Sequence, residues 1–187
     1  MKDVQREYPQ LSACGLNCGL CPRYHTDGSS RCPGCGGKEF STKHPLCGVI
    51  SCTQRHGEIE YCYLCEEYPC AKYDNAHLVD SFITHQNMRK DFEKVKTVGL
   101  AAYQAELNEK MEILQTLLEH YNEGRRKSFF CIAVNLLDIQ DVRDAMKQIE
   151  EKISQENTVK ENAAIAAGIF QAMADKRNIS LKLRKKS

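Results

Sequence analysis

Ten of the eleven cysteines lie between Cys14 and Cys70, a stretch of 57 residues. The same stretch contains only eight large aliphatic or phenylalanine side chains. So few apolar side chains bury too little area to offset the conformational entropy lost when a segment of this length becomes ordered. Another interaction must hold the segment together, and its thiols can form either disulfides or bonds to metal.

Disulfides and metal ligands occur in different compartments, so the expected location matters. The first seven residues lack the apolar run of a secretory signal peptide. No later stretch is long and apolar enough to span a bilayer, so we expect a cytoplasmic protein without membrane contact. In that reducing compartment, a dense cysteine pattern is typical of metal binding.

The spacing of the cysteines is typical of zinc knuckles. Three pairs are separated by two residues, namely Cys18 and Cys21, Cys32 and Cys35, and Cys62 and Cys65. Glycine or proline in or beside such a pair allows a tight turn that directs both sulfurs at one ion. The wider pair Cys47 and Cys52 suits a helical turn that completes a site. Soft thiolates in this pattern indicate zinc or an iron–sulfur cluster.

Zinc takes four ligands, so ten cysteines can form two complete sites and leave two residues over. The simplest division gives one ion Cys18, Cys21, Cys32 and Cys35, and the other ion Cys47, Cys52, Cys62 and Cys65. Cys14 and Cys70 are then alternates, with Cys70 in place of Cys47 or Cys14 in place of Cys18. Spacing fixes the partners within a knuckle but not between knuckles, so these alternatives stay open.

The whole cysteine pattern resembles a prokaryotic protein family known as domain of unknown function 3795. The resemblance covers residues 10–75, rests on all ten cysteines in the family's order, and includes the closing run Tyr68-Pro69-Cys70. It implies a metal-binding module, with zinc as the expected metal. It implies no reaction.

The same cysteines allow a second class of function, in which the chain is an iron–sulfur or thiol-based redox or metal-handling enzyme. Cys14, Cys18 and Cys21 have the spacing of radical enzymes that hold an iron–sulfur cluster, but those enzymes are βα barrels, and the residues after Cys70 predict helices. The spare pair Cys14 and Cys70 could instead form a redox sensor. The segment also contains three histidines whose imidazoles could bind metal, although ten thiols leave little need of them. They are His25, His44 and His56.

Charge and motifs limit the partners and the chemistry. Residues 1–80 contain eight Lys and Arg against ten Asp and Glu, and this net −2 charge weighs against nucleic acid as a partner. The basic run 125–127 precedes a predicted helix start, where a small anion or an acidic protein could bind. No H-E-x-x-H or comparable catalytic pattern occurs, so we expect a binding or regulatory role and no reaction.

The second half of the chain has the periodicity of helices. We predict one from Met88 to Val98 between Asn87 and Gly99, a longer one from Tyr103 towards Gly124, and a central apolar one from Ser128. Two more follow, after Asp138 and after the capping box formed by Thr158 and Glu161. Short strands are expected at 11–13 and 179–184, where the sequence alternates.

The predicted fold therefore has two parts. Residues 1–75 form a small, metal-stapled, irregular α+β cysteine-rich module of the zinc-knuckle type. Residues 76–187 form a mainly α-helical bundle. The predicted function is zinc binding through two structural sites of four cysteines each.

Overall fold

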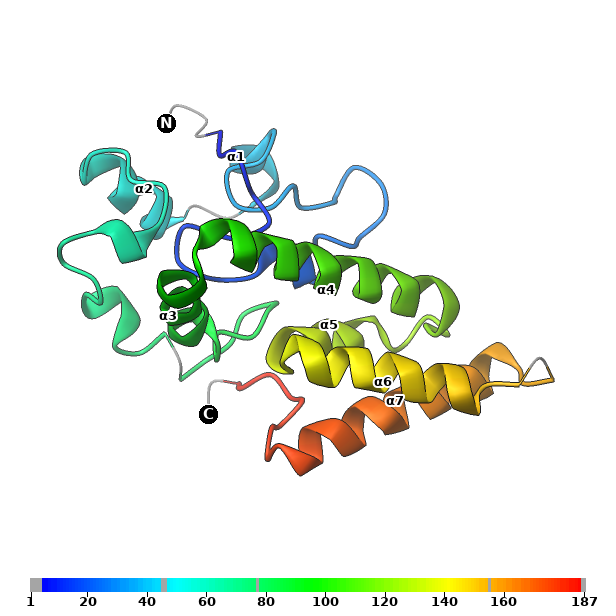
Figure 1. Cartoon of the computed structure of the whole chain (residues 1–187). Coiled ribbons are helices and arrows are strands. Elements are labelled where there is room, and N and C mark those ends of the chain that lie inside the picture. Colours follow the sequence, from blue (N-terminus) through cyan, green and yellow to red (C-terminus); the bar gives the residue numbers. More distant parts are fainter. Residues whose placement is uncertain (1–4, 45–46, 77, 155, 186–187) are drawn as a thin grey trace. The chain divides into compact units, whose positions relative to one another are not determined.

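A computed structural model describes residues 5–44, 47–76, 78–154 and 156–185 (Figure 1). In these residues the chain forms seven α-helices: α1 (Phe40–Lys43), α2 (Gly48–Arg55), α3 (Met88–Val98), α4 (Leu100–His120), α5 (Lys127–Leu136), α6 (Ile139–Lys152) and α7 (Val159–Lys176). Three short 3-10 helices accompany them: Cys18–Leu20, Cys62–Leu64 and Ala71–Tyr73. None of the helices in the described ranges has the length and apolar character that a membrane span requires.

The chain divides into two compact units. Unit 1 contains residues 1–104 and 184–187, and unit 2 contains residues 105–183. Helix α4 belongs to both units, because its first turn lies in unit 1 and the remainder in unit 2. The predicted boundary after residue 75 stays a prediction.

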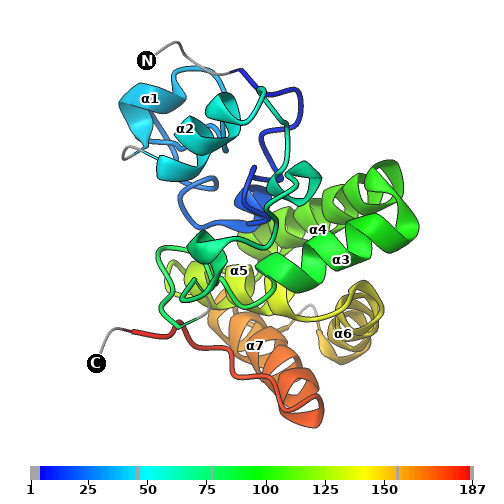
Figure 2. The same ribbon diagram turned by 90° about the vertical axis from the view of Figure 1, so that its left-hand side faces the viewer.

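The predicted α+β character of the cysteine-rich module is wrong. The described part of the chain contains helices and loops but no β-strand. At the predicted strand 11–13, a single antiparallel bridge joins Leu11 and Asn17. The cause is local, because the Ser12 N–H and the Leu16 carbonyl close a tight loop through a 2.8 Å hydrogen bond, which leaves no length for a ladder. Figure 2 shows unit 1's cysteine-rich segment as short helical turns connected by loops.

The predicted strand at 179–184 is also absent. The Ile179 N–H donates to the Ala174 carbonyl at the end of α7, over 2.8 Å. Farther along, the Arg184 N–H donates to the Asp80 carboxylate over 2.7 Å, and the Arg184 guanidinium pairs with the same carboxylate. A helix end and a side chain therefore satisfy backbone donors that a sheet would otherwise pair.

Helix α3 is the main apolar element in unit 1, and its predicted limits are confirmed. Asn87 precedes it, and Gly99 ends it with a φ of 87°, which only glycine adopts readily. Its fully buried Phe92 meets three rings of the cysteine-rich segment, with centroid distances of 6.3 Å to Tyr61, 5.0 Å to Tyr63 and 5.8 Å to Tyr68. These rings supply apolar contact that the segment's few aliphatic residues cannot supply.

A buried polar network also joins α3 to the segment. The Asn17 amide donates to the Asp91 carboxylate over 2.9 Å, and the Tyr103 hydroxyl donates to the Asn17 side-chain oxygen over 3.0 Å. All three side chains are at most 9% exposed. Because buried polar groups are costly unless they are paired, this network fixes Asn17, the residue before Cys18.

In unit 2, α6 and α7 run antiparallel beside one another (Figure 1) and α5 packs against α7. Helix α5 is buried from Phe130 to Leu136, as its apolar sequence predicts. The capping box at the start of α7 is confirmed, because the Thr158 and Glu161 side chains each accept the other residue's backbone N–H. Helix α4 starts at Leu100 and ends at His120, so it begins and ends three to four residues earlier than predicted.

Candidate metal centre

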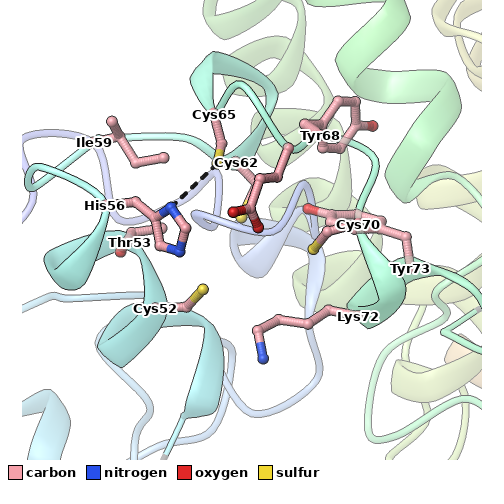
Figure 3. Close-up of a pocket in the computed structure, with 11 residues that line it drawn as sticks. Cys52, Thr53, His56, Ile59, Cys62, Cys65, Tyr68, Cys70, Lys72 and Tyr73 are labelled. Atoms are coloured by element: carbon pink, nitrogen blue, oxygen red, sulfur yellow. Dashed lines mark hydrogen bonds between the residues drawn. The ribbon is translucent and has the colours of Figure 1, made fainter.

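Four of the clustered cysteines line one pocket in unit 1. They are Cys52, Cys62, Cys65 and Cys70, and Figure 3 shows their sulfur atoms directed toward the same space. The free volume is about 20 Å³. A space of this size holds one water or one ion, whereas sites for small organic ligands are roughly ten times larger or more.

One helix and two short turns present these four thiols. Cys52 lies in the middle of α2. Cys62 and Cys65 stand at the two ends of a 3-10 turn that is closed by a 3.0 Å hydrogen bond from the Cys65 N–H to the Cys62 carbonyl. Cys70 precedes the next such turn, in which its carbonyl accepts from the Tyr73 N–H over 2.8 Å. A tight turn therefore lies between Cys62 and Cys65.

Hydrogen bonds hold this part of the segment to its beginning. The Cys62 N–H donates to the Ala13 carbonyl over 2.8 Å, and the Tyr73 hydroxyl donates to the Cys14 carbonyl over 3.0 Å. The Tyr73 side chain is only 3% exposed and also lines the pocket. Tyr73 was not predicted from the sequence, although an aromatic residue three positions after the last clustered cysteine is a visible signal.

Burial has the largest effect on the protonation of the Cys62 thiol. It raises the pKa of Cys62, and the nearby thiols of Cys52, Cys70 and Cys65 raise it further, while a hydrogen bond with Tyr73 works against both effects. Without a cation the Cys62 thiol therefore keeps its proton at neutral pH. A metal ion must displace that proton to bind.

One histidine lies beside the pocket thiols. His56 follows Cys52 by one helical turn, and its Nδ1 is 3.7 Å from the Cys65 sulfur (Figure 3). The other two histidines of the segment face elsewhere. His25 Nε2 is 2.7 Å from the Gly19 carbonyl oxygen, and the His44 ring stacks on Phe40 at 4.5 Å. Of these three histidines, only His56 is placed to donate beside the four sulfurs.

The other six clustered cysteines do not line this pocket. Cys18 and Cys21 stand at the ends of a third 3-10 turn, closed by a 3.1 Å hydrogen bond from the Cys21 N–H to the Cys18 carbonyl. Cys35 is fixed by a 2.8 Å hydrogen bond from its N–H to the Pro9 carbonyl. Burial raises the pKa of Cys14 to about 11 and that of Cys35 to about 12.

Gly34, inside the second knuckle, offers a test of this geometry. Its φ is 84°, and a Cβ atom there would lie 2.5 Å from the Pro9 carbonyl oxygen. Gly28 has a similar φ of 77°, but a Cβ there meets nothing within 4 Å. We expect Gly28→Ala to lower the free energy of unfolding by about 1 kcal/mol through backbone strain alone. Gly34→Ala should lower it by at least about 1 kcal/mol more, because the clash requires the backbone to move.

Urea denaturation of the two variants measures this difference directly. Equal losses of unfolding free energy in the two variants would mean that the turn from Cys32 to Cys35 can move away from Pro9 at no cost in stability.

The predicted division of ligands stays a prediction. All eleven cysteines are free thiols. Within the ranges that the structure describes, no three His, Cys, Asp or Glu side chains stand close enough together to hold an ion without moving. The pocket brings together Cys52, Cys62 and Cys65 from the predicted second set and the alternate Cys70, whereas Cys47 is not in its lining.

The basic run 125–127 includes the first residue of α5, because this helix starts at Lys127, one residue earlier than predicted. The Arg126 Nε is 3.5 Å from a Glu123 carboxylate oxygen, and the Arg126 N–H donates to the Asn122 side chain over 3.0 Å. Part of the positive charge is therefore already balanced within the chain. The anion site predicted there stays a prediction.

Comparison with curated proteins and comparison with solved structures each gave no match. A family model does match, and it is described as protein of unknown function (DUF3795). It covers residues 10–75, which include all ten clustered cysteines and the whole pocket lining. The resemblance predicted from the cysteine pattern is confirmed: the cysteine-rich segment of this chain is similar to the DUF3795 family.

Proposed function

We propose that this chain is a zinc-binding protein whose cysteine-rich segment is held together by structural metal, and that the protein serves in binding or regulation. The observation that carries the proposal is the small pocket around which four cysteine side chains gather. Cys52, Cys62, Cys65 and Cys70 would hold the ion. Bound zinc would cross-link α2 to the two turns that follow it, which is the role that apolar residues fill in larger cores.

The donor set and its surroundings fit zinc. Four thiolates around a divalent ion carry a net charge of −2, and Lys72 also lines the pocket and offsets part of it. A free volume of about 20 Å³ suits one ion better than a cluster that contains several iron and sulfide atoms. This observation favours zinc over the iron–sulfur alternative.

The same pocket supports a structural role over a catalytic one. A catalytic zinc keeps one position open for water or substrate, next to a general base. Four thiolates would fill a tetrahedral ion, and the free volume leaves no room for an organic substrate. The proposed role is therefore to maintain a surface that another molecule recognises.

Metal analysis tests the proposal. Protein purified without oxygen should contain zinc and show no visible colour, whereas the Cys62→Ser/Cys65→Ser variant should contain one zinc fewer per chain, as measured by inductively coupled plasma mass spectrometry. Cys131→Ala is the matched control, because Cys131 is 1% exposed inside α5 and is not among the clustered cysteines. Wild-type protein that is folded but free of zinc would contradict the proposal, and brown, iron-containing protein would favour the iron–sulfur alternative.

A further inference from the structure

Arg6 is a buried cation at the edge of the cysteine-rich segment. The whole residue is 8% exposed. Its guanidinium lies over the Tyr61 ring, with the Arg6 Cζ atom 4.8 Å from the ring centroid. Its guanidinium donates to the Leu11 carbonyl over 2.7 Å and to the Glu60 carbonyl over 3.1 Å, and it pairs with the Glu60 carboxylate at 2.9 Å. Its Nε has no hydrogen-bond partner among the residues that the structure describes. A buried polar atom without a partner is rare and calls for a physical reason.

The group beside Arg6 is Cys35. The Arg6 guanidinium lies 3.4 Å from the Cys35 carbonyl oxygen. Burial acts to lower the pKa of Arg6, and the charge of the Cys35 side chain is the strongest of the effects that raise it. The partly exposed Glu60 carboxylate ranks after it. Negative charge at Cys35 would therefore add to the compensation that the Glu60 carboxylate gives this cation.

Cys35 has three other thiols near it. It forms a small buried cluster with Ala13, Phe40 and Ile50, and both Cys18 and Cys47 pack against this cluster. Cys14 follows Ala13 in the chain, and its sulfur is 3.1 Å from the Ser12 hydroxyl oxygen. One apolar cluster thus gathers thiols from three separate stretches of the sequence.

The electrostatic influence of each thiol on the others agrees with this placement. Cys18 feels the charge of Cys35 first and that of Cys14 next, ahead of Cys21 and Cys32. Cys35 in turn feels Arg6 first and then Cys14 and Cys47. Packing and electrostatics therefore agree that Cys47 is a neighbour of Cys35, and the electrostatic influence adds Cys14.

We infer that Cys14, Cys18, Cys35 and Cys47 form a second site for a soft divalent metal ion such as zinc, with Arg6 as its buried counter-cation. None of the four lines the pocket of Figure 3, so this site is independent of the one on which the proposed function rests. The assignment replaces Cys21 and Cys32 of the simplest sequence-based division with Cys14 and Cys47. Cys21 and Cys32 are then the two spare thiols.

Nearby positive charge offsets part of the negative charge of this arrangement. Four thiols release four protons and bind one divalent ion, which leaves a net charge of −2. Arg6 offsets one unit of it beside Cys35. Cys47 immediately precedes α2, where the free N–H groups at the start of the helix favour a thiolate.

Paired double variants test the assignment. Wild-type protein should bind two zinc ions, the Cys14→Ser/Cys47→Ser variant one, and the control variant Cys21→Ser/Cys32→Ser two. Stoichiometry is read by inductively coupled plasma mass spectrometry and by the cobalt(II) absorption of the substituted protein. Loss of an ion in the control with retention in Cys14→Ser/Cys47→Ser would overturn the proposal, as would a wild-type protein that binds only one ion. The pocket is tested separately, because Cys62→Ser/Cys65→Ser should keep the ion assigned here.

A measurement on the unaltered chain guards against variants that fail to fold. Cys21 and Cys47 are both partly exposed, so solvent access alone does not distinguish them. In zinc-loaded wild-type protein, iodoacetamide should modify Cys21 before a chelator is added and Cys47 only afterwards, as peptide mass spectrometry reports. Modification of Cys47 in the loaded protein, with Cys21 protected, would overturn the assignment. Arg6→Gln should release one of the two ions at a tenfold or greater lower chelator concentration, and unchanged release would refute the role of Arg6.

Discussion

Removal of zinc with a strong chelator should unfold the cysteine-rich segment while α6 and α7 stay folded. The segment has only eight large aliphatic or phenylalanine residues from Cys14 to Cys70. The apparent binding free energy of a structural zinc ion is on the order of 10–16 kcal/mol, and in such a module most of it is folding free energy. By contrast, unit 2 has its own apolar core, in which Phe130, Val142, Ile149 and Phe170 are fully buried. It has no cysteine except Cys131.

Hydrogen–deuterium exchange resolved by peptide is the appropriate measurement, because it reports each part of the chain separately. Peptides from residues 10–75 should lose protection after chelation, and peptides from α6 and α7 should keep theirs. The control is the same chelator already saturated with zinc, which should change nothing. Equal protection of residues 10–75 with and without metal would show that side-chain contacts alone hold the segment, and the proposed function would fail with it.

Local signals were sufficient to predict several helices. Gly99 ends α3, and the reciprocal bonds of Thr158 and Glu161 set the start of α7, whereas Asn87 precedes α3 but its side chain does not cap that helix. These signals act within a single turn of the chain, so they can be read from neighbouring residues. The two predicted strands failed because a strand requires a partner, and alternation in the sequence does not reveal whether one exists.

The grouping of cysteines could be predicted only in part for the same reason. Turn chemistry within a knuckle is local, and the turns at Cys18 and Cys62 form as expected. Which knuckles share a site depends on how loops far apart in sequence come together. The pocket brings α2 and Cys70 together, and the apolar cluster around Cys35 brings it together with Cys18 and Cys47. Neither arrangement is encoded in the spacing.

Arg6 and Asn17 were missed entirely. Both are polar residues that the fold buries, and their partners lie far along the chain: Glu60 for Arg6, and Asp91 and Tyr103 for Asn17. In the sequence each appears as an ordinary solvated residue. Buried polar groups of this kind are recognised only when their surroundings are known.

Phe92→Ala should destabilise unit 1 by about 3–5 kcal/mol, the usual cost of removing a fully buried phenylalanine ring. Phe92 is 0% exposed, and its ring packs at its edges against Tyr61, Tyr63 and Tyr68. A Cβ built on Gly15 would lie 3.1 Å from the same ring, so Phe92 also touches the loop beside Cys14. Alanine would leave a cavity where α3 meets the segment.

The variant Val98→Ala is the matched control, because Val98 ends the same helix and is 47% exposed. Its effect should stay within about 0.5 kcal/mol. Urea denaturation of zinc-loaded protein, followed by tyrosine fluorescence, measures both variants, since the three rings around Phe92 are themselves tyrosines. Zinc content should fall in neither variant under native conditions, because Phe92 is not part of the pocket's lining. A loss below about 1 kcal/mol for Phe92→Ala would mean that metal alone holds the segment and that the aromatic contacts with α3 add nothing to its stability.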